Sequence, residues 1–333
     1  MQQLDKLWRR GTDFLGCRYA IMGGAMSWVS EHHLVAAISN AGGFGVIACS
    51  AMPPEALRQE IRKTRTLTDQ PFGVNLIVMH PDLEQLVGVC ADENVSHVVL
   101  AGGIPSKQTI EAIKAYGGKV IGFAPALAIG KKLLRSGVDA LVIEGMEAGG
   151  HIGPVSTSVL VQEIIPYLKD EAPIFVAGGI GRGETIASYL EMGASGVQLG
   201  TKFVCATESI AHPNFKRAFI KAAARNAMPS VQIDPEFPVI PVRAIENKAT
   251  NDFTKVQLET IAQYRSGALD KQQAQLKIEH FWAGSLRRAV IDGDVEHGSL
   301  MAGQSVGMVE KEQPVKEILE ELLAQANAFL AAA

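Results

Sequence analysis

Short apolar runs alternate with amphipathic segments over the first 200 residues of the chain. The runs have the length and composition of buried strands, and they are Tyr19–Met22, Gly45–Ala48, Phe72–Leu76, His97–Leu100, Val120–Phe123, Ala140–Ile143, Ile174–Ala177 and Gly196–Leu199. The segments between them have the helical spacing of apolar positions, and Ser30 and Pro54 provide start signals for the first two helices. Strands that alternate with helices predict an α/β protein with a parallel sheet. Eight strands are the number that closes a TIM (β/α)8 barrel, and a doubly wound open sheet is the alternative.

The pattern changes after Cys205. Residues 206–300 read as mainly helical, apart from a less regular stretch with prolines at Met228–Pro241. The last segment, Val315–Ala333, has the apolar spacing of an amphipathic helix. We therefore expect a barrel over residues 1–205, a smaller helical lid or substrate domain over 206–300, and a C-terminal segment, 301–333, that returns to the barrel.

Composition excludes several classes of protein. The chain has 333 residues, of which 47% are hydrophobic and 20% charged, so it can bury a large core. The net charge of −4 gives no general attraction for nucleic acid. Its four cysteines are widely spaced and contain no CxxC pair, which argues against a disulfide framework or a zinc site. The longest apolar run, about residues 120–130, is too short for a membrane span, and the polar N-terminus does not read as a signal peptide. We expect a cytoplasmic protein that does not enter membranes.

Glycine clusters follow two of the predicted strands. The first is Gly178-Gly-Ile-Gly-Arg-Gly183, after the seventh strand, and the second is Gly200-Thr201, after the eighth. In barrels, the loops after these two strands commonly bind a phosphate through backbone N–H groups and a helix N-terminus. A tight turn between strand and helix is the alternative. The spacing is neither a Rossmann fingerprint nor a Walker A motif.

One histidine has a setting unlike the other seven. His151 lies in Glu144-Gly-Met-Glu-Ala-Gly-Gly-His-Ile-Gly153, directly after the sixth strand. The glycines, including Gly149 and Gly150, would let the backbone approach a flat ligand while the imidazole takes or gives a proton. A structural histidine is the alternative. No two histidines show metal-ligand spacing with a carboxylate, so we expect no metal centre.

Small or polar residues end three further segments. Small residues in Ala20-Ile-Met-Gly-Gly-Ala-Met-Ser-Trp28 would let a flat ring lie against the backbone, unless they only form a turn. Asn75 ends the third strand, where its amide can pair with a heterocycle, and Glu144 either holds a ligand hydroxyl or caps a loop. Gly298-Ser-Leu-Met-Ala-Gly-Gln304 is a late glycine-rich contact, or else a helix start capped by Ser299.

These motifs together resemble the FMN-dependent barrel family of nitronate monooxygenases (2-nitropropane dioxygenases) and FabK-type enoyl-[acyl-carrier-protein] reductases. The resemblance covers about residues 15–325, and the block around His151 is its most specific part. Residues 207–216 and 293–304 are more similar to the FabK branch. One motif departs from the family, which usually reads Gln-Gly-Gly-Met where this chain has Gly23-Gly24-Ala25-Met26.

The resemblance implies bound FMN at the barrel mouth, with His151 as the active-site histidine. It implies contacts to the isoalloxazine ring from the Gly24 loop, to the ring edge or ribityl chain from Asn75 and Glu144, and to the phosphate from the two glycine clusters. The residues implied to contact the cofactor are Gly24, Ala25, Met26, Asn75, Glu144, Gly149, Gly150, Gly178, Gly179, Gly200, Thr201, Met301, Ala302, Gly303 and Gln304.

Two reactions are compatible with this family. One is the reduction of a 2-enoyl thioester with NADH or NADPH in fatty acid synthesis, in which His151 would supply a proton. The other is the oxidation of an alkyl nitronate with O2, in which His151 would act as a base. A flavin-binding barrel without catalysis is a remote third possibility. Arg217, Lys221 and Arg225 recur every four residues, so we expect them on one face of a helix, either solvated or meeting acyl carrier protein. A homodimer is plausible from the resemblance.

Overall fold

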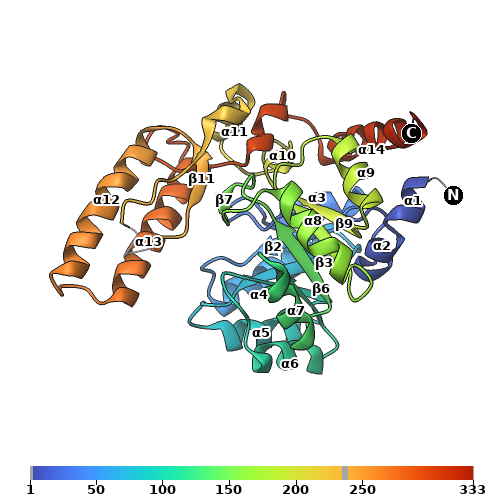
Figure 1. Ribbon diagram of the computed structural model, residues 1–333, viewed down its shortest axis with the longest axis horizontal. Coiled ribbons are helices and arrows are strands. Elements are labelled where there is room, and N and C mark those ends of the chain that lie inside the picture. Colours follow the sequence, from blue (N-terminus) through green and yellow to red (C-terminus); the bar gives the residue numbers. More distant parts are fainter. Residues whose placement is uncertain (1–2, 235–238, 333) are drawn as a thin grey trace.

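The computed structural model describes residues 3–234 and 239–332, and its centre is a sheet of eight parallel strands (Figure 1). The strands are β1 (Ile21–Gly23), β2 (Gly45–Ala48), β3 (Phe72–Ile77), β4 (His97–Ala101), β5 (Lys119–Phe123), β6 (Ala140–Glu144), β8 (Ile174–Ala177) and β9 (Gly196–Leu199). They follow one another in the order β1-β9-β8-β6-β5-β4-β3-β2. All eight coincide, within two residues at each end, with the apolar runs that predict them.

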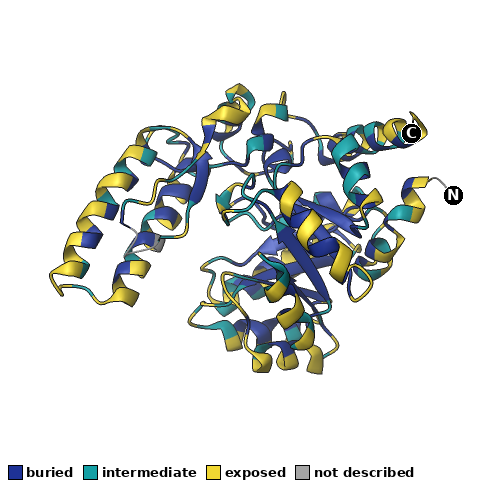
Figure 2. Cartoon of the chain, viewed as in Figure 1, coloured by how far each residue is buried: buried dark blue, intermediate teal, exposed yellow. Residues whose placement is uncertain are grey.

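The two ends of this sheet meet. A parallel bridge joins Met22 to Phe44, and the Phe44 amide donates to the Ile21 carbonyl at 2.9 Å. The strands therefore form a barrel, as predicted, and the doubly wound alternative is wrong. Almost every residue of these strands is buried, which explains their continuous apolar sequences (Figure 2).

Helices cover the outside of the barrel. They are α1 (Gln3–Leu7), α2 (Arg9–Leu15), α3 (His32–Asn40), α4 (Pro54–Leu67), α5 (Leu83–Asp92), α6 (Lys107–Ala115), α7 (Leu127–Arg135), α8 (Thr157–Leu168), α9 (Gly183–Glu191) and α10 (Thr201–Val204). Pro54 opens α4 as expected. The predicted cap of α3 is wrong, because Glu31 rather than Ser30 accepts the amides of His33 and Leu34. Gly45 lets α3 pack directly on β2, since a Cβ there would lie 2.3 Å from the Val35 carbonyl oxygen.

The chain after the barrel builds a smaller unit. It contains α11 (Pro213–Lys221), the 3-10 helix η1 (Ala224–Asn226), β10 (Ala227–Pro229), β11 (Val242–Ile245), α12 (Lys248–Arg265) and α13 (Lys271–Val290). The pair α12 and α13 projects away from the barrel and encloses its own apolar cluster around Phe253, Ile278 and Trp282 (Figure 1). Residues 235–238 of the irregular stretch Met228–Pro241 lie outside the described residues.

A small second sheet, which the sequence reading missed, connects this unit to the barrel. Its central strand β11 pairs with β10, with β12 (Leu300–Met301) and with β7 (Gly150–His151), always antiparallel. Because β7 lies in the segment that follows barrel strand β6 and β12 lies in the late glycine-rich segment, β11 joins parts that are far apart in sequence. Met301 packs against both the barrel core and the cluster between α12 and α13.

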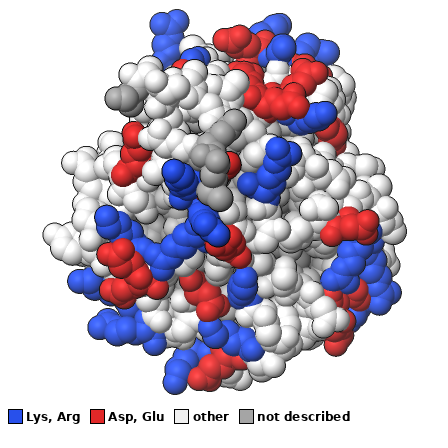
Figure 3. All heavy atoms as spheres, turned by 90° about the vertical axis from the view of Figure 1, so that its right-hand side faces the viewer, with Lys and Arg blue, Asp and Glu red and all other residues white. Residues whose placement is uncertain are grey.

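The C-terminal segment returns to the barrel. After the 3-10 helix η2 (Gln304–Met308), helix α14 (Val315–Ala332) packs along α9 and near α1 (Figure 1). The Gly183 amide donates to the Gln325 side chain at 2.8 Å, and a Cβ at Gly183 would clash with the Leu322 carbonyl. On the face that carries these elements, basic and acidic side chains are interspersed (Figure 3). Among the described residues, no helix has both the length and the apolar character that crossing a membrane requires.

Candidate functional site

The residues predicted for a cofactor site gather at the carboxyl ends of the barrel strands. The loop after β1 contacts the loop after β9, because the Gly24 amide donates to the Leu199 carbonyl at 2.7 Å. The Ser30 side chain fixes the loop after β1. Its hydroxyl donates to the Gly24 carbonyl at 2.8 Å and accepts the Met26 amide at 3.0 Å. The backbone of Gly24 and Met26 is therefore fixed, while Ala25 and Met26 remain partly exposed.

The two glycine clusters present backbone donors. Gly178 and Gly179 have positive φ values of 93° and 74°, which favour glycine, and both are partly exposed. Within the described part of the chain, the amides of Gly178, Gly179 and Gly200 donate to no protein acceptor. Unpaired N–H groups at strand ends and at a helix start, here α10, are the kind of donors that bind anions. Thr201, predicted to contact the same anion, also accepts the Gly303 amide at 2.9 Å with its hydroxyl.

His151 lies in a short strand rather than a free loop. Strand β7 pairs His151 with Val242 and Gly150 with Arg243 of β11, and the Ile152 amide donates to Pro241 at 2.9 Å. The His151 side chain is exposed to solvent at the barrel mouth. Its backbone is thus held by the small second sheet, while its imidazole stays accessible to a ligand.

A buried polar network braces the segment before His151. One Glu147 carboxylate oxygen accepts both the amide and the hydroxyl of Thr157, each at 2.8 Å, at the start of α8. Arg243, only 2% exposed, donates to the carbonyls of Met146 and Ala227. Burial lowers the pKa of Arg243, and the Glu147 carboxylate partly opposes that effect. No sequence motif indicated Thr157 or Arg243, because the members of this network come from separate segments of the chain.

The late glycine-rich segment lies against the segment before His151. The Gln304 amide donates to the Glu147 carbonyl at 2.9 Å, and a Cβ at Gly303 would lie 2.7 Å from that same oxygen. A Cβ at Gly149 would lie 2.6 Å from the Ala302 carbonyl carbon. The two segments are therefore in backbone contact. Ser299 caps no helix, because strand β12 follows it, so that alternative is wrong.

Asn75 and Glu144 offer polar groups from the strands themselves. The Asn75 amide nitrogen donates to the Val99 carbonyl at 3.0 Å, and its oxygen has no partner among the described residues. Burial raises the pKa of Glu144 from 4.5 to about 7, although the nearby His151 lowers it. At neutral pH this carboxyl is therefore partly protonated and can donate a hydrogen bond.

The described cysteines offer no alternative chemistry. All four are free, and burial raises the pKa of each thiol to about 12. A thiol with such a pKa is not a nucleophile at neutral pH. The reactive groups at the barrel mouth are thus a carboxyl, an imidazole and unpaired amides, which fit a flat phosphorylated cofactor beside a proton donor.

Comparison with known proteins supports this picture. A family model described as nitronate monooxygenase matches residues 9–87 and 82–325. The structure of FabK from Thermotoga maritima is 36% identical, with 97% of each chain covered and a TM-score of 0.85. The structure of a nitroalkane oxidase from Streptomyces ansochromogenes is 25% identical, with 97% of this chain and 99% of that chain covered and a TM-score of 0.79.

A further relative has a different name. The (3aS,4S,5R,7aS)-5-hydroxy-7a-methyl-1-oxo-octahydro-1H-indene-4-carboxyl-CoA dehydrogenase of Rhodococcus jostii is 27% identical over 95% of this chain and 94% of its own length. The match of the family model over most of the chain decides the assignment. The chain belongs to the nitronate monooxygenase family of flavin-dependent oxidoreductases and is itself an enzyme.

Proposed function

We propose that the chain is an FMN-dependent reductase that reduces 2-enoyl thioesters with NADH or NADPH. The observation that carries the proposal is the 36% identity to FabK over 97% of the chain, against 25% to the nitroalkane oxidase. The Rhodococcus relative, whose name includes a carboxyl-CoA, supports a thioester substrate. Bound FMN would supply hydride transfer from the nicotinamide to the β-carbon of the enoyl group.

The residues of the chain would bind the cofactor and complete the reaction. The amides of Gly178, Gly179 and Gly200 would bind its phosphate, and the Asn75 oxygen would accept from a ring N–H. A partly protonated Glu144 would donate to a ribityl hydroxyl. After hydride reaches the β-carbon, the α-carbon needs a proton. The exposed imidazole of His151 is the proton donor, or steadies the enolate oxygen with its N–H.

Exposed basic residues would meet the acyl carrier protein. Arg217 and Lys221 lie on α11. The expectation that Arg225 lies on the same helix is wrong, because α11 ends at Lys221 and Arg225 belongs to η1. All three side chains are exposed. Reversing the charge of Arg217 and Lys221 is expected to raise the KM for a carrier-bound enoyl substrate. The KM for the same acyl group on a short neutral thiol should not change.

Anaerobic reduction of the flavin distinguishes the proposal from its alternative. Mixing the oxidised holoprotein with NADH or NADPH should bleach the flavin absorbance within seconds. A nitronate monooxygenase, which the family model and the nitroalkane oxidase favour, should be bleached by propyl-2-nitronate and by neither nicotinamide. The second result would overturn the reductase proposal.

Replacing the histidine tests its role in the same protein. His151→Ala is expected to bind FMN normally while turnover falls about 100-fold or more, the usual scale for general acid–base catalysis. His280→Ala, at an exposed position of α13, is the matched control and should keep full turnover. Near-normal turnover in His151→Ala would remove His151 from the mechanism.

A further inference from the structure

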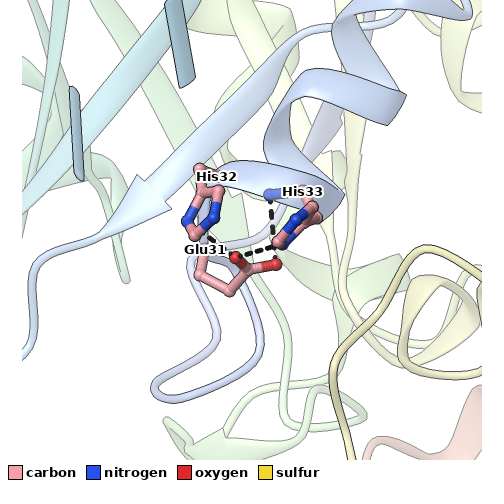
Figure 4. A group of neighbouring side chains, drawn as sticks. All are labelled: Glu31, His32 and His33. Carbon is pink, nitrogen blue, oxygen red and sulfur yellow. Dashed lines mark hydrogen bonds and ion pairs between the residues drawn. The ribbon is translucent and has the colours of Figure 1, made fainter. Parts of the chain in front are cut away.

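Two histidines and two glutamates meet at the start of α3, just beyond the loop that Ser30 holds. Ligand atoms of Glu31, His32 and His33 all lie within 4.8 Å of one another. Figure 4 shows both imidazole rings turned toward the Glu31 carboxylate. Glu60 of α4 joins them, because its carboxylate lies 2.6 Å from Nδ1 of His32 and accepts the His32 amide at 2.7 Å.

Both carboxylates of this cluster are buried. Glu31 and Glu60 are each only 8% exposed. Among the described residues, no lysine or arginine lies within 4.0 Å of either carboxylate, and their ionic partners are His32 and His33 alone. Buried carboxylates are normally paired with cations or coordinate metal ions. The centroids of the two imidazole rings are only 4.1 Å apart.

We propose that Glu31, His32 and His33 bind a divalent transition metal ion such as Zn²⁺. Two imidazoles and one carboxylate are a ligand set that Zn²⁺ takes, with water in the fourth position. Imidazole nitrogen distinguishes this set from the all-oxygen sites of Mg²⁺ and Ca²⁺. The His33 side chain is 52% exposed, so an ion can enter from solvent.

Glu60 has the role of an orienting group. Metal-binding histidines usually donate their second N–H to a carboxylate, which fixes the tautomer and the direction of the ring. The Glu60 carboxylate, 2.6 Å from Nδ1 of His32, is in the position of such a group, and the Glu31 carboxylate lies 2.8 Å from the same nitrogen. The proposal differs from the sequence analysis, which expects no metal centre, because Glu60 is 28 residues away and the proposed ligands are adjacent in sequence rather than spaced along a helix.

The metal would act next to the cofactor loop without taking part in catalysis. Glu31 directly follows Ser30, whose hydroxyl holds the Gly24 carbonyl and the Met26 amide. Glu31 also caps α3 through its other carboxylate oxygen. An ion at this point would tie the start of α3 to α4 and stiffen the loop.

Direct metal analysis tests the proposal independently of the reaction that the enzyme catalyses. Holoprotein stripped with a chelator would be dialysed against buffered Zn²⁺ and analysed for its metal content. We expect one Zn²⁺ per chain and a rise in the melting temperature. Mg²⁺ at the same concentration should give neither.

Three variants locate the site. His33→Ala removes an exposed ligand and should weaken Zn²⁺ binding at least tenfold, and Glu60→Gln should weaken it by about tenfold or more. His297→Ala is the control, because His297 is an exposed histidine beside Asp294 at a distant position, and it should bind as the wild type does. The proposal would be overturned if the wild-type protein bound no Zn²⁺. It would also be overturned if His33→Ala bound Zn²⁺ as tightly as the wild type, or if His297→Ala lost Zn²⁺ binding. Binding of as much Mg²⁺ as Zn²⁺ by the wild-type protein would also overturn it.

Discussion

Glu144 gives the barrel mouth an unusual dependence on pH. Burial raises its pKa from 4.5 to about 7, so the folded protein holds a proton that the unfolded chain has released. A carboxyl whose pKa is higher in the folded protein than in the unfolded chain makes its full contribution to the free energy of unfolding below pH 4.5. That contribution is lost as the pH rises through 7. The two pKa values correspond to a loss of about 2.5 kcal/mol between pH 5 and pH 8. Because Glu144 is partly exposed and solvent screens its charge, we expect a loss of about 2 kcal/mol in the free energy of unfolding.

Glu144→Gln should remove this loss, since glutamine resembles the protonated carboxyl and does not ionise. Urea denaturation of the flavin-free protein at pH 5 and pH 8 measures it. The free energy of unfolding of Glu144→Gln, relative to the wild type, should rise by about 2 kcal/mol from the lower to the higher pH. Glu171→Gln, at an exposed position before β8, controls for the loss of a carboxylate. A difference that stays constant between the two pH values would refute the reasoning.

Two further predictions concern the barrel floor and the late segment. Burial lowers the pKa of His97 to about 4, so its contribution to stability is present above pH 6.5 and is lost as the pH falls through 4. Wild-type protein should lose about 2–3 kcal/mol from this group between pH 7 and pH 4.5, and urea denaturation of His97→Gln should lack that loss. Gly303→Ala would place a Cβ 2.7 Å from the Glu147 carbonyl and push the two segments apart. FMN binding, followed by fluorescence quenching, should weaken at least tenfold, and unchanged affinity would exclude this contact from the cofactor site.

The sequence predicted the barrel well because buried parallel strands are continuous apolar runs. Their ends were clear wherever glycine or a polar residue followed, as at Glu144 and Gly178. Helix starts are harder to predict, because Ser30 is a preferred cap residue whereas the adjacent Glu31, which is not, takes the cap position of α3. Tertiary contacts decide between them, since the Ser30 hydroxyl is already bonded to Gly24.

The second sheet could not be predicted in the same way. Strands β7 and β12 have only two residues each, too few for any periodic pattern. They exist because β11, which comes from a distant part of the chain, supplies their backbone partners. The same holds for the brace between Glu147 and Thr157 and for the contact between Glu60 and His32. Each joins groups whose proximity depends on the completed fold.

The candidate site residues also differ in how far the sequence alone indicates their positions. The backbone contact between Gly303 and the segment before His151 is seen only in the structure. The contacts of Asn75, Glu144 and the glycine amides with a cofactor stay predictions that the geometry supports. The placement of Arg225 beside Lys221 on one helix is the error, because the helix ends before it.

Reoxidation of the reduced enzyme tests the central claim most directly. Holoprotein reduced anaerobically with one equivalent of NADH or NADPH would be mixed with crotonyl-CoA, and flavin absorbance and thioester products would be followed together. The account predicts that the yellow colour returns and that one butyryl-CoA forms per flavin. Reduced flavin that persists with crotonyl-CoA and with longer enoyl thioesters, yet reoxidises rapidly with O2, would contradict it.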